Sequence, residues 1–159
     1  MKLAILTGVL GVMWMGAMQA GELVVADAYA REMPPGVMSS AVYLSIINSS
    51  DKAVTLVNVG SPSAEKVMVH QNTIHADMMR MRPVTRLEIA AHSQFDFAPG
   101  AYHLMVMGLS QPLRAGGDLN LELKFEGGQV LAVAVPVLNA VDGSKHVDTH
   151  KSMAIKVQD

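Results

Sequence analysis

Two histidines and two methionines in the middle of the chain have the residue types of a metal site: His70, Met81, His103 and Met105. They follow the spacing H-x(10)-M-x(21)-H-x-M. Imidazole and thioether side chains together suit monovalent copper better than they suit most other metals. The sequence therefore predicts one Cu(I) ion bound by these four side chains, which are expected to lie on neighbouring strands.

The spacing of the last two ligands is that of one face of a β-strand. Residues 101–107 alternate in polarity, so that His103 and Met105 share a face with Met107. The Cα atoms of residues i and i+2 on a strand lie about 6.6 Å apart, which lets both side chains lean onto one ion. Met68 and His70 are expected to share a strand face in the same way.

The absence of cysteine narrows the chemistry of any metal site. A chain without thiols has no disulfide, no thiolate zinc site and no iron–sulfur cluster. It also lacks the thiolate that a blue-copper electron-transfer site requires. The His/Met set is therefore expected to hold copper rather than to use it for electron transfer.

Sequence motifs of hydrolytic enzymes are missing, and we predict that the protein is not an enzyme. The sequence has no G-x-S-x-G nucleophile motif. His70 and His75 do not form the H-E-x-x-H of zinc proteases. Four protein ligands leave no open position for a water molecule, so such a site suits holding a metal better than activating water.

The composition fits one globular domain. The chain has 159 residues, of which 50% are hydrophobic and 16% are charged. These values are typical of a chain that can fill a core. The formal net charge is −2, and no run of lysines and arginines is present. We therefore expect no binding to nucleic acid, which requires a basic stripe.

Residues 1–20 are predicted to be a secretory signal peptide. Lys2 precedes an apolar stretch that ends in small residues near Ala20. An uncleaved anchor is the alternative, since residues 3–20 are just long enough to span a bilayer. Cleavage would give an exported protein with no stable membrane insertion.

The remaining chain divides into a copper-binding domain at 21–138 and a flexible tail at 139–159. The tail is more polar than the domain and has no strand pattern. Its His146, His150 and Met153 could bind a second copper ion, as Cu(II), or could have no metal role. Composition alone leaves both alternatives open.

Short alternating runs separated by turn residues predict an all-β protein, a Greek-key β-sandwich of a single domain. Loops are expected at 32–38 and 72–77, and Pro83 is expected to end the strand that precedes it. The predicted strands are 22–31, 39–48, 53–59, 64–71, 78–82, 85–89, 94–97, 101–107, 119–126 and 130–137.

Three further side chains are secondary candidates for the metal site. His75 lies in the predicted loop and could be a labile ligand or an exposed residue. Met107 shares the face of His103 and is expected to pack beneath the site and exclude water. His92 lies in a polar turn with no evident partner in the sequence, so no metal role is predicted for it.

The motif and its surroundings resemble the periplasmic copper chaperone family known as PCuAC. The resemblance rests on the complete spacing of the four ligands and on the segment PGAYHLMVMGL around the second half of the motif. Similarity extends from Val25 to Val137. The resemblance implies a cupredoxin-like β-sandwich, bound Cu(I), and delivery of copper to a cytochrome c oxidase subunit, with a Sco-type thiol protein as a further partner.

The sequence-based hypothesis is a periplasmic Cu(I) metallochaperone that serves cytochrome c oxidase assembly or periplasmic copper homeostasis. Neutral thioethers hold Cu(I) less tightly than thiolates do, so an acceptor with cysteines can take the ion. Histidine ligands compete with protons, so loading is expected to weaken as the pH falls through about 6.5. The alternative is a non-metal β-sandwich interaction module whose Met-rich face is an apolar docking surface.

Overall fold

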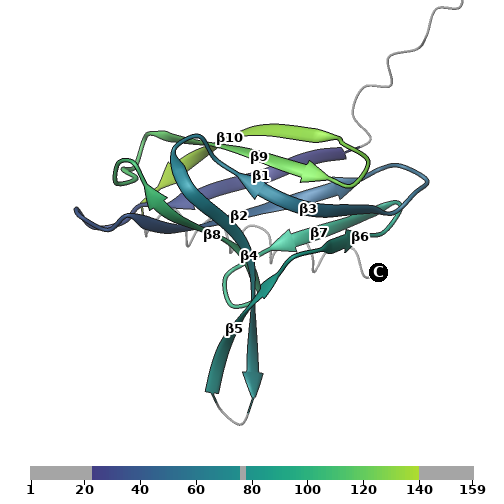
Figure 1. Ribbon diagram of the computed structural model, residues 1–159, viewed down its shortest axis with the longest axis horizontal. Helices are drawn as coiled ribbons and strands as arrows, with labels where there is room; N and C mark the ends of the chain where they lie inside the picture. The colour runs from purple at the N-terminus through teal and green to yellow at the C-terminus, as the bar shows by residue number, and fades with distance from the viewer. Residues whose placement is uncertain (1–22, 76–77, 140–159) are drawn as a thin grey trace, which may run out of the picture.

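The protein folds into ten β-strands, and the computed structural model describes residues 23–75 and 78–139 (Figure 1). None of these residues belongs to a helix, and so none belongs to a helix that could cross a membrane. The strands are β1 (Leu23–Arg31), β2 (Ser39–Asn48), β3 (Val54–Gly60), β4 (Ala64–His75), β5 (Met78–Val84), β6 (Leu87–Ile89), β7 (Ser93–Phe97), β8 (Tyr102–Leu109), β9 (Asp118–Phe125) and β10 (Val130–Leu138).

The strands form one ladder that folds back on itself. Its order is β5-β4-β8-β2-β1-β10-β9-β3-β6, and a further pairing of β4 with β3 brings distant parts of the ladder together. Strand β7 pairs with β2 off this path, and β1 runs parallel to β10. Most neighbours in the ladder are not consecutive in sequence, as in Greek-key sandwiches. The predicted all-β sandwich is therefore confirmed.

Alternating strand residues fill the interior of the sandwich. In β9 every second side chain is buried and the side chains between them are exposed. The inner face of β8 buries Leu104 and Val106 completely, and the inner face of β4 buries Val67 and Val69. Burial of one such side chain contributes roughly 1.5–3 kcal/mol. The inner faces of β4 and β8 therefore anchor both strands, and their outer faces are free to carry other chemistry.

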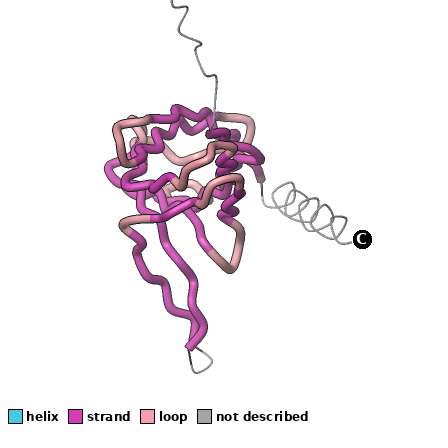
Figure 2. Tube along the Cα trace, turned by 90° about the vertical axis from the view of Figure 1, so that its right-hand side faces the viewer, coloured by secondary structure: helices cyan, strands magenta, loops and turns pink. Residues whose placement is uncertain are grey.

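Strand β4 pairs with β8 on one side and with β5 on the other. The pairing with β8 ends where Gln71 meets Tyr102, whereas the pairing with β5 continues to His75 and Met78. The outer part of the β4–β5 hairpin therefore extends beyond the end of β8. Figures 1 and 2 show this hairpin projecting from the body of the molecule.

The length of the hairpin corrects two predictions. The expected loop at 72–77 is wrong for residues 72–75, which continue β4 because each of them pairs with a residue of β5. Pro83 does not end β5, which runs on to Val84. Strand β5 is the terminal strand of the ladder, where the missing N–H of a proline removes no hydrogen bond to a further strand.

Other predictions of the chain's organisation have different outcomes. The loop at 32–38 is confirmed. The predicted signal peptide at 1–20 lies outside the described residues, and so does the predicted tail apart from Asn139. The division into leader, domain and tail therefore stays a prediction.

Candidate metal site

His70 and His103 form the centre of the candidate site. They are direct cross-strand partners on β4 and β8, so their side chains leave the ladder on the same face. Their ring centroids are 5.6 Å apart, and the ring planes meet at 88°. His103 is buried, with 5% of its surface exposed, and His70 is half-buried. Two imidazoles from different strands can therefore reach one ion.

Met105 lies on the same face of β8 as His103 and directly opposite Met68 of β4. Two adjacent cross-strand pairs thus bring together two imidazoles and two thioethers, which we call the His–Met quartet: Met68, His70, His103 and Met105. Both methionines of the quartet are half-buried. The sequence pattern put Met68 on the face of His70 but did not single it out as a ligand, because only the register of β4 against β8 reveals its partner.

The fourth predicted ligand, Met81, lies apart from the quartet. It is opposite Asn72 on β5 and diagonal to His70, beyond the end of β8, and 62% of its surface is exposed. In a flat sheet, two strand spacings and four residue rises would separate the Cα atoms of Met81 and Met105 by about 16 Å. The structure therefore brings His70, His103 and Met105 together and leaves Met81 on the hairpin, and its role as a ligand stays a prediction.

The electrostatic setting favours neutral donors. Burial lowers the pKa of His103, and the charge that His70 can carry lowers it further. A lowered pKa keeps His103 neutral at pH 7, with a lone pair available to a metal. Within the described ranges, no group of three or more His, Cys, Asp and Glu side chains could hold a metal ion. The donors near the two histidines are therefore thioethers rather than carboxylates, which suits a soft cation.

Two buried polar atoms at the site have no hydrogen-bond partner among the described residues: His70 Nδ1 and Asn72 Oδ1. Buried atoms of this kind are rare, and leaving them unpaired costs stability. A metal bound to His70 fits this observation. One ring nitrogen would bind the ion, and the other would carry a proton for an acceptor. Asn72 lies two residues from His70 on the same face of β4 and carries the unpartnered acceptor.

The secondary candidates lie outside the His–Met quartet. His75 is the last residue of β4, opposite Met78, so its predicted place in a loop is wrong. Met107 is half-buried and follows Met105 on the same face of β8. His92 has a partner after all, because its Nε2 lies 2.8 Å from Asp51 Oδ1. The candidates of the tail lie outside the described residues.

Comparison with known sequences gives a family match over most of the chain. The sequence model of the LpqE-like family, described as "Putative lipoprotein LpqE-like", matches residues 23–137. A protein of Leifsonia xyli subsp. xyli, "Putative lipoprotein Lxx21020", is 29% identical over 120 residues. This match covers 75% of the present chain and 71% of the Leifsonia protein.

Comparison with solved structures gives PCuAC-type proteins. The solution structure of CuI-DR1885 from Deinococcus radiodurans is 30% identical, with a TM-score of 0.57, and the match covers 74% of this chain and 78% of that one. The copper-bound PCuAC domain from PmoF2 is 20% identical, with a TM-score of 0.63, and the match covers 75% and 94% of the two chains. At 20% identity, the similarity to the PmoF2 domain shows the fold, and it confirms the predicted cupredoxin-like architecture.

Proposed function

The chain belongs to the LpqE-like family of PCuAC-type proteins, and from that premise we propose that it is a non-enzymatic copper chaperone that carries one Cu(I) ion. The observation that carries the proposal is the direct opposition of His70 and His103, with the thioether of Met105 on the same face. Two strands with buried inner faces hold these three side chains, so the donors are arranged before the ion arrives.

We propose that the ion is bound by the side chains of the predicted motif: His70, Met81, His103 and Met105. All four donors are neutral when the histidines are deprotonated, so the complex keeps the positive charge of Cu(I). Soft thioethers and borderline imidazoles favour Cu(I) over hard cations such as Mg²⁺ and Ca²⁺. The name of the CuI-DR1885 structure, a relative at 30% identity, supports the choice of ion.

Delivery would follow from the difference between thioether and thiolate ligands. The chain has no cysteine, so an acceptor with thiolates binds Cu(I) more tightly and takes it by ligand exchange. We propose the copper centre of a cytochrome c oxidase subunit as the acceptor, directly or through a Sco-type thiol protein. General periplasmic copper homeostasis would use the same site. The lipoprotein names of the family and of the Leifsonia relative support export, and we propose the periplasm as the location.

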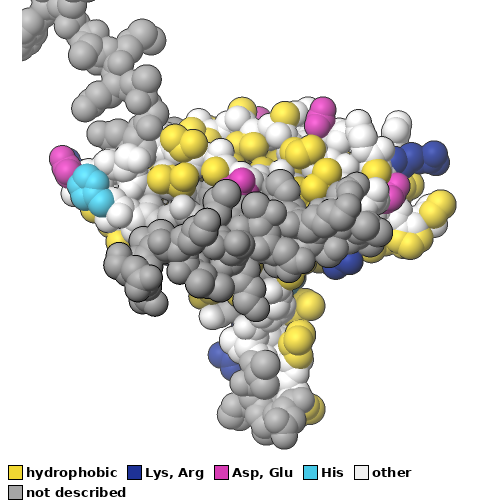
Figure 3. All heavy atoms as spheres, turned by 180° about the vertical axis from the view of Figure 1, so that it is seen from behind, with side chains coloured by type: hydrophobic (Ala, Val, Ile, Leu, Met, Phe, Trp, Pro, Cys, Tyr) yellow, Lys and Arg dark blue, Asp and Glu magenta, His cyan; other side chains and the backbone are white. Residues whose placement is uncertain are grey.

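A second candidate function has one observation in its favour. Three of the exposed large hydrophobic side chains gather on β5: Met78, Met79 and Met81 are 55%, 64% and 62% exposed. Arg80 and Arg82 alternate with Met79 and Met81 along the strand, whereas Met78 lies on the face of the two arginines. Figure 3 shows the projecting hairpin with hydrophobic side chains along one side and a basic side chain on the other. Such a surface could dock a partner protein without any metal.

Titration with Cu(I) separates the two functions. The purified protein is titrated under reductant in the presence of a chromophoric Cu(I) chelator, whose colour reports the copper that the protein has not taken. We expect the protein to withdraw one equivalent of Cu(I) from the chelator. A docking module would leave the colour of the chelator unchanged at every protein concentration, and that result would contradict the copper proposal.

A further inference from the structure

We propose that Met68 is an additional thioether ligand of the Cu(I) ion and that it exchanges with Met81. In the conformation described here, with the hairpin extended, Met68 would supply the fourth donor. Met81 would replace Met68 when the hairpin bends toward β8. This inference rests on the proposed function, since it assigns a further residue to the same site.

The register of β4 against β8 is the first observation that supports the proposal. Met68 and Met105 are directly opposed, and so are His70 and His103. Opposed Cα atoms in an antiparallel pair are about 5 Å apart, and residues two apart along a strand are about 6.6 Å apart. The centre of the His–Met quartet is therefore about 4 Å from each of its Cα atoms in projection. Both histidine and methionine side chains are long enough to reach an ion above that centre.

The position of Met81 is the second observation that supports the proposal. Met81 is diagonal to His70, but Met105 is diagonal to His70 in the opposite direction along β4. An ion held between His103 and Met105 is therefore displaced from Met81 both across the ladder and along it. The hairpin has to bend before Met81 can bind such an ion. Met68 needs no backbone movement, because it already belongs to the strand that carries His70.

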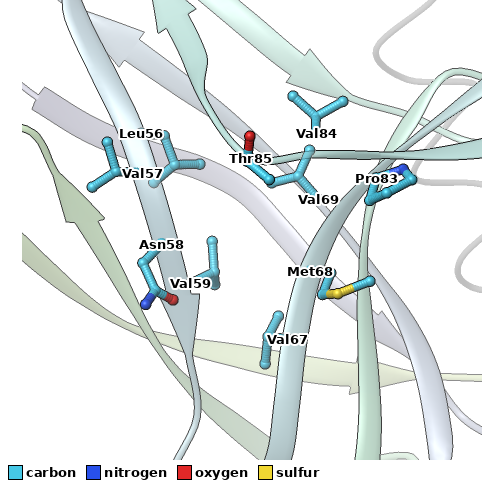
Figure 4. Close-up of a pocket in the computed structure, with 10 residues that line it drawn as sticks. All are labelled: Leu56, Val57, Asn58, Val59, Val67, Met68, Val69, Pro83, Val84 and Thr85. Atoms are coloured by element: carbon cyan, nitrogen blue, oxygen red, sulfur yellow. The ribbon is translucent and has the colours of Figure 1, made fainter.

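The surroundings of Met68 give its side chain room to move. A crevice of about 160 Å³ lies between β3, β4 and the end of β5, and Met68 is among the residues that line it, with Val59, Val67 and Pro83. In Figure 4 the side chains of Val67 and Met68 leave β4 on opposite sides. A flexible thioether beside open space can change rotamer without displacing packed neighbours. The alternative to a ligand role is that Met68 lines the crevice and does not bind copper.

The exchange of Met68 for Met81 conserves the number of copper–sulfur bonds and changes the exposure of the site. One copper–sulfur bond, to Met68, breaks, and another, to Met81, forms, while the copper remains Cu(I) and no proton or electron is transferred. Met68 is half-buried, whereas 62% of Met81 is exposed. Replacement of Met68 by Met81 would therefore move the ion toward the projecting hairpin, where an acceptor can approach it.

X-ray absorption on loaded variants tests the role of Met68, because it counts sulfur neighbours of copper directly. The variants are Met68→Leu, Met81→Leu and the double variant, which conserve side-chain volume and remove only the sulfur. Met38→Leu, at an exposed position outside β4, β5 and β8, is the matched control. We expect two sulfur neighbours in the control and in each single variant, and one in the double variant.

Chelator competition gives a second readout. We expect each single variant to lose less than about tenfold in Cu(I) affinity and the double variant more than about 100-fold. The role of Met68 would be overturned if Met81→Leu alone reduced the sulfur count to one and if adding Met68→Leu changed neither count nor affinity. An unmodified protein that binds no Cu(I) would instead contradict the proposed function, so the two failures are distinguishable.

Discussion

His103 and Leu104 are adjacent on β8, and both are buried, but they face opposite sides of the ladder. Leu104 packs into the hydrophobic core, while His103 lies against His70 on the outer face. Because core packing fixes the backbone of β8, it also fixes the imidazole of His103. The candidate ligands of β8 are therefore held by the same packing that stabilises the sandwich.

Replacing His103 tests the nitrogen donors. We expect His103→Gln to weaken Cu(I) binding by more than about 100-fold, because loss of a direct ligand costs at least as much as loss of a residue that orients one. Competition against a chromophoric chelator measures the change. His92→Gln is the matched control, since His92 is exposed and bonded to Asp51 in a distant turn. Equal losses in the two variants would mean that copper binds histidines without regard to the quartet.

Replacing Met105 tests the sulfur donors. We expect Met105→Leu to weaken Cu(I) binding by more than about tenfold, while the change in the free energy of unfolding stays below about 1.5 kcal/mol. Met107→Leu serves as the control, because Met107 lies on the same face of β8 but is two residues farther than Met105 from His103, the partner of His70. The two affinities are compared by chelator competition. The assignment fails if Met107→Leu is the more damaging change.

The lowered pKa of His103 predicts how the stability of the copper-free protein depends on pH. The unfolded chain takes up a proton on this histidine near pH 6.5, whereas burial makes the folded state resist protonation. Stability is therefore highest above about pH 6.5 and falls as the pH decreases below it. Urea unfolding between about pH 8 and about pH 5.5 measures this slope.

His103→Gln provides the control for the pH experiment, because glutamine does not titrate. We expect the variant to show a shallower fall in the free energy of unfolding over the same range, after the two curves are aligned above about pH 7. Identical slopes for both proteins would show that other groups cause the dependence.

Asn72 is expected to separate stability from copper binding. Its Oδ1 is buried and has no partner among the described residues, and such an atom costs about 1–3 kcal/mol. We expect Asn72→Ala to leave the copper-free protein as stable as before or more stable. We also expect it to weaken Cu(I) binding by about tenfold, because the substitution removes the unpartnered acceptor that lies two residues from His70 and could receive the N–H of a copper-bound His70. Thermal unfolding and chelator competition measure the two effects, and a destabilised variant with unchanged affinity would refute this role.

Local patterns were sufficient to predict the strands that carry the site. The alternation around His103 predicted both faces of β8 correctly, because one face had to enter the core. Asn72 and Thr73 were predicted to lie in a loop. The structure extends β4 through them because β5 supplies a partner for each, and a pairing of this kind cannot be read from one segment alone.

The register of the strands determines the contacts that the sequence alone could not predict. The spacing of the motif gives no information on which residue faces His103, because a shift of one residue between β4 and β8 would point every side chain the other way. The closeness of Met68 to Met105 became visible only with the pairing of the strands. The bond between His92 and Asp51 was missed for the same reason, since the two residues come from separate turns.

X-ray absorption on the unmodified protein loaded with one equivalent of Cu(I) tests the central claim most directly. The account predicts a coordination shell of two imidazole nitrogens and two thioether sulfurs around the copper. A shell without sulfur would contradict it, because no methionine would then bind the ion. A shell composed of oxygen donors would contradict it as well, because the ion would then not bind at His70 and His103.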